Sequence, residues 1–282
     1  MDPGDLRDEM VDGIESRLSV DDAVALAMRT VSRTDFVDDA PYDGRSEVDG
    51  TTALAPEMVA RLLTALDVDA RNVPGDAADS GAEAVGTTGD ADESAEDAVR
   101  SADTPDAPGD VLVVGAGVGY TAAILAELVG ETRVHAVDID RRLVYAARSN
   151  LESAGYGGVL VDAGDGARGL PDYAPFDRIL VEAAAIEPPR RLVEQLAPDG
   201  RLVLPLGGPE QSLAVVDETG SVIERCGPVA FKPLLVDGEQ GSAPARNRTV
   251  REDAERASEP GYFAKTGWEQ EWIDWDEQLR RR

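Results

Sequence analysis

Three closely spaced glycines follow an apolar run in a pattern that suits ligand binding by a polypeptide loop. Val111–Val114 predicts a strand buried on both faces, and Gly115, Gly117 and Gly119 come directly after it. Glycine has no Cβ, so the chain can turn tightly and its backbone can come close to a ligand. Residues 121–129 then predict a helix. Strand, glycine turn and helix together are typical of sites for nucleotide-like ligands.

Two aspartates stand at equivalent places after the next two predicted strands. Asp138 follows a predicted strand at 133–137, and Asp165 precedes Gly166 after a short strand at 159–161. A carboxylate at the position of Asp138 can accept hydrogen bonds from both hydroxyls of a ribose. Asp165 is placed to accept a hydrogen bond from an adenine amino group, and Gly166 lets the base lie close. Parallel strands deliver such residues to one edge of the sheet.

The spacing of the glycines distinguishes among nucleotide-like ligands. A dinucleotide fingerprint requires a third glycine at position 120, where this chain has Tyr120. The observed spacing, G-x-G-x-G, resembles the turn of S-adenosylmethionine (SAM) methyltransferases. A dinucleotide site and a purely structural turn remain the alternatives.

The pattern beyond residue 111 predicts an α/β fold. Strands and helices alternate, which favours a doubly wound, mostly parallel, seven-stranded Rossmann-like sheet with helices on both faces. Two segments flanking residues 217–220 predict a hairpin, so the sheet should end antiparallel at one edge. The other strands are predicted at 177–181, 201–206, 213–216, 222–225 and 229–236, and the other helices at 143–154 and 189–196.

The chain divides into four segments by composition. Residues 1–70 predict a helical cap over the substrate, with two helices within 4–32, the second capped by Asp21, and a third helix at 57–66. Residues 71–110 hold eleven acidic residues and predict a disordered or loosely helical insert, or alternatively an interaction arm. Residues 111–237 form the ligand-binding core. In the tail, 238–282, three tryptophans at helical spacing predict a face that docks on the protein itself, or on a partner.

The composition limits partners and location. The chain has 56 Asp plus Glu against 27 Lys plus Arg, a net charge of −29, and only two of the basic residues are lysines. Such a surface is typical of proteins that work in concentrated salt, with an acidic mesophilic protein as the alternative. It argues against a nucleic-acid partner. Cys226 is the single cysteine, no apolar run is long enough to span a membrane, and no export signal is evident, so we expect a cytoplasmic monomer.

These features come together in one resemblance. Over most of residues 5–237, leaving out the acidic insert, the chain resembles the protein-L-isoaspartate O-methyltransferases. The resemblance implies methylation of the carboxylate of an isoaspartyl peptide, with SAM held by Gly115, Gly117, Gly119, Asp138, Asp165 and Gly166. A methyltransferase of this fold with another acceptor, or a SAM-binding protein without catalysis, are the alternatives. The matching segments are 27–37, 111–121, 164–166, 176–179, 183–185, 205–207 and 231–234.

The chain departs from the family pattern where the acceptor should bind. Residues 50–56 align with the family motif Gly-Gln-Thr-Ile-Ser-Ala-Pro, but Leu54 occupies the serine slot and Glu57 stands where a histidine is common. Leucine cannot donate a hydrogen bond to a carboxylate, and Glu57 would repel one. Our hypothesis is that Thr51 or Thr52 takes over the role of the serine hydroxyl.

Four further residues bear on the predicted site. Val113 also departs from the family, which has an acid two residues before the first glycine. His135 lies within a predicted strand without a second histidine or a cysteine nearby, so we expect no metal site. Arg168 and Glu182 lie near strand ends, where they could touch substrate, but we expect surface roles for both.

Overall fold

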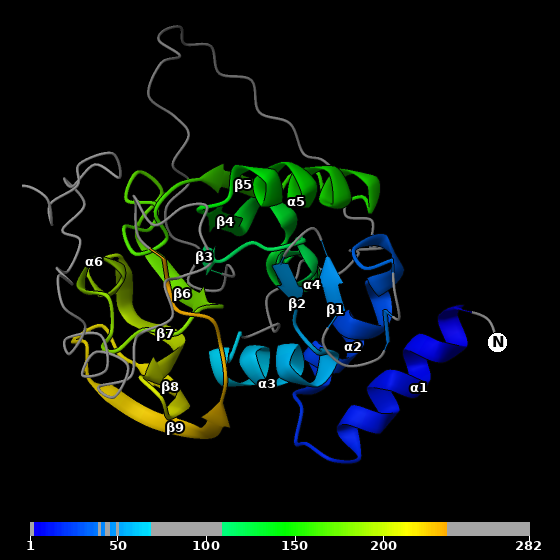
Figure 1. The fold of residues 1–282 in the computed structure, drawn as a ribbon, viewed down its shortest axis with the longest axis horizontal. Helices are drawn as coiled ribbons and strands as arrows, with labels where there is room; N and C mark the ends of the chain where they lie inside the picture. Colours follow the sequence, from blue (N-terminus) through cyan, green and yellow to red (C-terminus); the bar gives the residue numbers. More distant parts are fainter. Residues whose placement is uncertain (1–2, 39–40, 43–45, 49–50, 69–108, 236–282) are drawn as a thin grey trace, which may run out of the picture. The chain divides into compact units, whose positions relative to one another are not determined.

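Seven strands form one mixed sheet in the order β5-β4-β3-β6-β7-β8-β9 in the computed structural model (Figure 1). The first five strands in this order are parallel, and β8 and β9 add to β7 in antiparallel fashion. The predicted fold class and the antiparallel edge are therefore confirmed. The strands are β3 (Val111–Val114), β4 (Val134–Asp138), β5 (Leu160–Ala163), β6 (Phe176–Val181), β7 (Leu196–Gly207), β8 (Gln211–Val216) and β9 (Val222–Val229).

The structure describes residues 3–38, 41–42, 46–48, 51–68 and 109–235, with the backbone alone for 3, 46–48 and 51–52. The predicted acidic insert, apart from Gly109 and Asp110, and the tryptophan-bearing tail lie outside the described residues. The N-terminal helices and the sheet belong to one compact unit, Met1–Gly238.

The alternation of side chains along each strand creates two apolar layers. In β3, Val111 and Val113 face one layer, and Leu112 and Val114 face the other. Five helices cover the first layer, and a single helical turn, α6 (Arg190–Val193), covers part of the second. The five are α1 (Pro3–Glu15), α2 (Asp22–Thr30), α3 (Pro56–Leu66), α4 (Tyr120–Val129) and α5 (Arg141–Ser153).

A helix cap and a cluster of ion pairs stabilise the two N-terminal helices. The side chain of Asp21 accepts a hydrogen bond from the N–H of Ala23, which confirms the predicted cap of α2. Arg29 on α2 pairs with Asp12 and Glu15 on α1, each at 2.6 Å. The 3-10 turn η1 (Arg33–Asp35) follows α2, and the small hairpin of β1 (Ser46–Val48) and β2 (Thr51–Ala53) comes next. A second 3-10 turn, η3 (Glu131–Arg133), lies between α4 and β4.

Two predicted elements differ from the structure. The helix predicted at 189–196 ends at Val193, because the carbonyl of Gln195 already accepts a hydrogen bond from the N–H of Phe176 and carries the chain into the sheet. The strand predicted at 229–236 is absent from residues 230–235, where only an isolated bridge joins Pro233 to Ala184. Proline has no backbone N–H and cannot continue a ladder of hydrogen bonds.

Candidate functional site

The carboxyl ends of four parallel strands meet at one edge of the sheet (Figure 1). The registers place Val114 of β3 beside Val137 of β4 and Val181 of β6, and Asp138 beside Ala163 of β5. The residues that follow these strand ends are Gly115, Asp138, Asp165 and Glu182. Strand order reverses at β3, because the chain continues to β4 and β5 on one side and returns to β6 on the other. Ligands bind at such a point in open α/β sheets.

The glycine turn is built on left-handed backbone. Gly115, Gly117 and Gly119 have φ angles of 94°, 53° and 95°, which residues with a Cβ rarely adopt. Their N–H groups are already engaged, with Val137 O, the Asp138 carboxylate and Ala116 O respectively. These N–H groups are therefore not free to donate hydrogen bonds to a ligand. The turn offers a ligand a surface without side chains, and its own hydrogen bonds hold that surface rigid.

The glycines of the loops serve two different purposes. A Cβ on Gly117 would meet only the carbonyl oxygen of Gly115, at 4.0 Å, so the space beside Gly117 is open. A Cβ on Gly119 would lie 3.1 Å from Leu151, and one on Gly166 would lie 2.4 Å from Val114. Gly119 and Gly166 are thus required by packing, whereas Gly117 keeps room free at the strand ends.

Asp138 links the first two strands at the site. Its Oδ2 accepts a hydrogen bond from the N–H of Gly117 at 3.0 Å, and its Oδ1 accepts one from the N–H of Asp140 at 2.9 Å. Burial raises the pKa of this carboxyl, although both N–H groups counteract the shift. Asp165 lies in the loop after β5, where its Oδ1 accepts a hydrogen bond from the N–H of Ala167 at 2.9 Å. Both carboxylates therefore have their orientation fixed by the backbone.

A small cavity separates the glycine turn from the N-terminal segment. Its volume is about 30 Å³, room for one or two water-sized groups. Hydrophobic and polar side chains share its wall, and the polar ones come from three distant parts of the chain. The residues that line it include Arg33, Leu54, Gly117, Tyr120, Thr121 and Glu182.

Arg33 is a buried cation in this cavity wall, with 1% of its surface exposed. Its guanidinium lies over the ring of Tyr120, 4.5 Å from the ring centroid, and Nη2 donates a hydrogen bond to the carbonyl of Leu54. Its Nε is buried without a partner. Burial lowers the pKa of Arg33, but arginine stays charged in proteins. Arg33 lies within the matching segment 27–37, but no sequence pattern singled it out as a site residue.

Glu182 faces the same cavity, so the surface role expected for it is wrong. Its Oε1 is buried and has no hydrogen-bond partner. Burial raises its pKa to about 7, opposed by hydrogen bonding to Thr121 and by the charge of Arg33, while the charge of Asp138 adds to the rise. Near neutral pH this carboxyl therefore exists in both protonation states. Arg168, by contrast, is exposed as expected.

The residues that depart from the family motif occupy different places. Leu54 lines the cavity. Glu57 is absent from the cavity wall and pairs with Arg17 at 3.3 Å, so the expected repulsion of an acceptor carboxylate by Glu57 is not supported. Thr51 and Thr52 lie in β2, but their side chains are outside the described residues. Val113 is buried within β3.

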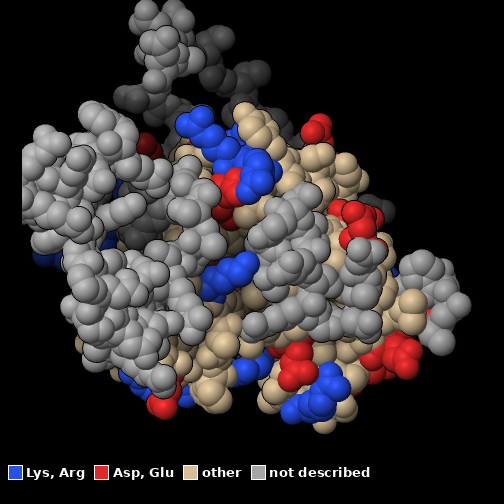
Figure 2. All heavy atoms as spheres, viewed as in Figure 1, with Lys and Arg blue, Asp and Glu red and all other residues tan. Residues whose placement is uncertain are grey.

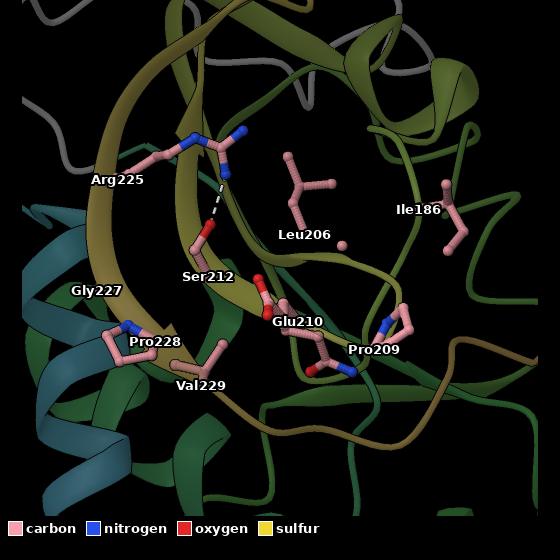
Figure 3. Close-up of a pocket in the computed structure, with 11 residues that line it drawn as sticks. Ile186, Leu206, Pro209, Glu210, Ser212, Arg225, Gly227, Pro228 and Val229 are labelled. Atoms are coloured by element: carbon pink, nitrogen blue, oxygen red, sulfur yellow. Dashed lines mark hydrogen bonds between the residues drawn. The ribbon is translucent and has the colours of Figure 1, made fainter.

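A larger groove of about 730 Å³ opens at the same edge of the sheet, beyond β7 (Figure 3). Ile186 borders one side, and Pro228 and Val229 at the end of β9 border the other. Arg225 reaches across the groove wall to donate a hydrogen bond to Ser212. Ile186 is 78% exposed although it is aliphatic. A groove with apolar borders and backbone edges suits an extended polypeptide.

Other features of the described residues place limits on the chemistry. No group of three or more His, Cys, Asp or Glu in the described ranges is arranged to hold a metal ion. His135 packs against the rings of Tyr173 and Phe176, and burial lowers its pKa.

None of the helices described is both long and apolar enough to cross a membrane. On the face in Figure 2, basic and acidic side chains lie next to one another.

Comparison with known proteins identifies the family. The sequence model for protein-L-isoaspartate(D-aspartate) O-methyltransferases matches residues 106–240. Protein-L-isoaspartate O-methyltransferase 2 of Archaeoglobus fulgidus is 34% identical over 252 residues, which cover 86% of this chain and 97% of that protein. The chain belongs to the protein-L-isoaspartate O-methyltransferase family. The resemblance drawn from the sequence motifs is confirmed.

Similarity within the family is strongest over about half of the chain. The protein-L-isoaspartate O-methyltransferase of Aeropyrum pernix is 52% identical over 141 residues, 48% of this chain and 54% of that protein. The alignment with the Methanococcoides burtonii enzyme covers 64% of that relative. Among solved structures, a putative protein-L-isoaspartate O-methyltransferase from Plasmodium falciparum in complex with S-adenosyl-L-homocysteine has a TM-score of 0.62 at 21% identity. The superposition covers 81% of this chain and 98% of the Plasmodium falciparum chain. This likeness supports the fold.

Proposed function

We propose that the protein uses SAM to methylate the free carboxylate of isoaspartyl residues, the damaged form of aspartyl residues in proteins. The observation that carries this proposal is the meeting of the glycine turn, Asp138 and the cavity of Arg33 and Glu182 at one edge of the sheet. Family membership supports the same activity, because the relative from Archaeoglobus fulgidus aligns over nearly its whole length.

The residues at the strand ends fit SAM as the methyl donor. Gly117 leaves open space where a Cβ would project, so a ligand can approach the backbone there. Asp138, held by two N–H groups, would accept hydrogen bonds from the ribose hydroxyls. Asp165 would accept one from the adenine amino group, with Gly166 beside it and Gly115 and Gly119 shaping the turn.

The reaction asks for alignment more than for acid–base catalysis. When bound, SAM supplies a methyl group on a sulfonium, and its transfer to a carboxylate oxygen yields a methyl ester and S-adenosylhomocysteine. A carboxylate is already nucleophilic, so no side chain has to remove a proton. The chain therefore contributes by positioning two reactants and by excluding water. The small volume of the cavity, and the buried side chains around it, suit that task.

The groove beyond β7 is our candidate for the polypeptide that carries the damaged residue. It opens at the same edge of the sheet as the cavity, and Ile186 lies four positions after Glu182 in the chain. An extended peptide placed there would bury the exposed side chain of Ile186. The cavity and the groove together support a scheme in which the reacting carboxylate and its flanking residues bind at separate places.

Thr51 and Thr52 remain candidates for orienting the acceptor, because the serine slot holds Leu54. A hydroxyl on either threonine could donate a hydrogen bond to the acceptor carboxylate. The double variant Thr51→Val and Thr52→Val tests this hypothesis. An unchanged rate of methylation of an isoaspartyl peptide would show that neither hydroxyl contributes.

We also propose the working conditions of the enzyme. The net charge of −29 and the low number of lysines support activity in concentrated salt, where the repulsion among acidic groups is screened. The single cysteine is compatible with a reducing cytoplasm. We propose that the protein is a monomer. We also propose that it binds no nucleic acid, because a strongly acidic chain would repel phosphate. Size measurement by light scattering in 2 M potassium chloride checks the monomer.

Methyl transfer to paired peptides tests the proposed activity. The assay follows radiolabel from SAM to an acetylated isoaspartyl peptide, and to the matched aspartyl peptide, in concentrated potassium chloride. We expect base-labile label on the isoaspartyl peptide alone. Equal label on both peptides, or none on either while S-adenosylhomocysteine still binds, would show that the acceptor is something else or that the protein only binds SAM.

A further inference from the structure

We propose that protonated Glu182 and Arg33 together hold the acceptor carboxylate, and so replace the serine hydroxyl that this chain lacks. The inference rests on the proposed isoaspartyl methyltransferase function and names the residues that position its acceptor. Both are positioning residues in this scheme, and neither takes part in forming or breaking a bond.

The geometry of the cavity carries the proposal. Arg33, Leu54 and Glu182 line one small space beside Gly117, at the edge where the strands end. Three polar atoms of the residues that line this space, Arg33 Nε, Tyr120 Oη and Glu182 Oε1, are buried and have no partner. Buried polar atoms without partners are uncommon and call for an explanation. A carboxylate guest would accept hydrogen bonds from Arg33 Nε and from protonated Glu182, and it would satisfy both atoms.

The charges around the cavity decide the protonation state that can receive the guest. Arg33 is the cation, and it also lies over Tyr120, whose pKa burial raises to about 12, so Tyr120 is neutral. Asp138 on β4 acts on Glu182 as a second negative charge. An acceptor carboxylate entering beside an ionised Glu182 would therefore meet like charge in a water-poor site. Neutral Glu182 removes that repulsion and gains an O–H donor.

The proton balance of the reaction is compatible with this role. The acceptor carboxylate becomes a methyl ester without gaining or losing a proton, so the proton stays on Glu182 throughout. Glu182 has a pKa of about 7, which means that binding of the acceptor should draw a proton from solution above neutral pH. Binding below pH 6 should draw almost none.

Proton uptake during peptide binding is the direct test. An acetylated isoaspartyl peptide is titrated into the full-length protein with saturating S-adenosylhomocysteine, by calorimetry in two buffers of different ionisation enthalpy. For a group of pKa near 7 we expect uptake of about 0.9 proton at pH 8 and about 0.1 at pH 6. Steady-state KM for the peptide should rise about tenfold over the same range.

Three variants separate the proposed role from a structural one. Glu182→Gln is always neutral and keeps an N–H donor, so its KM should be independent of pH and its proton uptake near zero. Glu182→Ala has no donor and should show a raised KM at every pH. Glu187→Gln makes the same change at an exposed position and should behave as wild type.

The possible results point to different conclusions. Methylation of the isoaspartyl peptide without proton uptake at pH 8, or uptake that persists in Glu182→Gln, would overturn the role of Glu182 and leave the proposed function standing. A rate that rises with pH and is lost in Glu182→Gln would mean that Glu182 acts as an anion, against our proposal. Absence of methylation and of peptide binding in the wild type would overturn the proposed function itself.

Discussion

The carboxylate of Asp138 accepts a hydrogen bond from the backbone N–H of Gly117, with 3.0 Å between Oδ2 and the nitrogen. This bond joins the end of β4 to the glycine turn after β3. It keeps the turn in one conformation and holds the carboxylate at the carboxyl edge of the sheet. A hydrogen bond within the chain thus joins the two parts of the proposed SAM site.

The variant Asp138→Asn tests the charge at this position. An amide of the same size loses the charged hydrogen bonds to the ribose, which are worth about 1.5–3 kcal/mol. The Kd for S-adenosylhomocysteine should therefore rise by about tenfold to a hundredfold, as measured by calorimetry in 2 M potassium chloride. Asp162→Asn, on the neighbouring strand β5, is the matched control and should keep the wild-type Kd.

Alanine at Gly119 should destabilise the protein more than alanine at Gly155. Gly119 lies in the left-handed helical region, and Gly155, with a φ angle of 91°, ends α5 in the left-handed cap where the N–H of Tyr156 bonds the carbonyl of Leu151, so both variants meet backbone strain of about 1–2 kcal/mol. Only at Gly119 would the new Cβ also press on Leu151, at 3.1 Å, which should add about 1 kcal/mol. Urea unfolding measures the two free energies. Equal losses would contradict the close packing of α4 against α5.

Glu182 should make the folded state less stable as pH rises. Its pKa is raised from 4.5 to about 7, so the folded protein holds this proton more tightly than the unfolded chain. The stabilisation is greatest below pH 4.5 and is lost as pH rises to about 7, a change of up to about 3 kcal/mol. Relative to wild type, Glu182→Gln should gain unfolding free energy between pH 5 and 8.

The control for this prediction is the neutralisation of an exposed acid. Glu187→Gln removes one negative charge from the loop that follows Glu182 and should keep the wild-type dependence of unfolding free energy on pH. Urea unfolding at pH 5, 6.5 and 8 supplies the comparison. If the difference in unfolding free energy between wild type and Glu182→Gln does not change with pH, then burial does not raise the pKa of Glu182.

A charge at Ile186 should weaken binding of long peptides. Ile186 is 78% exposed at the border of the groove, and covering it would contribute about 1 kcal/mol. The KM of Ile186→Asp for an eight-residue isoaspartyl peptide should therefore rise about fivefold, with the KM for a blocked single isoaspartate unchanged. Ile223→Asp, at a 57% exposed position outside the groove, is the control. If Ile186→Asp raises the KM equally for the eight-residue peptide and for the blocked isoaspartate, the flanking residues of the peptide do not bind at Ile186.

Local sequence patterns predicted the parts of the site that come from one strand and its loop. The run Val111–Val114, the glycines after it and Asp138 lie where the alternation of strand and helix places them. These features follow from neighbouring residues, so no knowledge of distant packing was needed. Their roles toward SAM stay proposals, because they depend on a ligand.

Features that depend on distant contacts escaped prediction. A cap formed by residues 1–70 was predicted, but no local pattern indicates that Arg33 of this segment meets Glu182 at the edge of the sheet. One signal was present, since Glu182 follows β6 directly, as Asp138 ends β4. The engaged N–H groups of the glycine turn and the early end of the helix after Pro189 depend on partners on other strands.

A crystal structure with S-adenosylhomocysteine and an isoaspartyl peptide, grown in concentrated salt, tests the central claim most directly. We predict the ribose on Asp138, the adenine beside Asp165, and the peptide carboxylate between Arg33 and Glu182. A structure that shows adenosine bound away from the glycine turn, or protein side chains filling the space beside Gly117, would contradict the account.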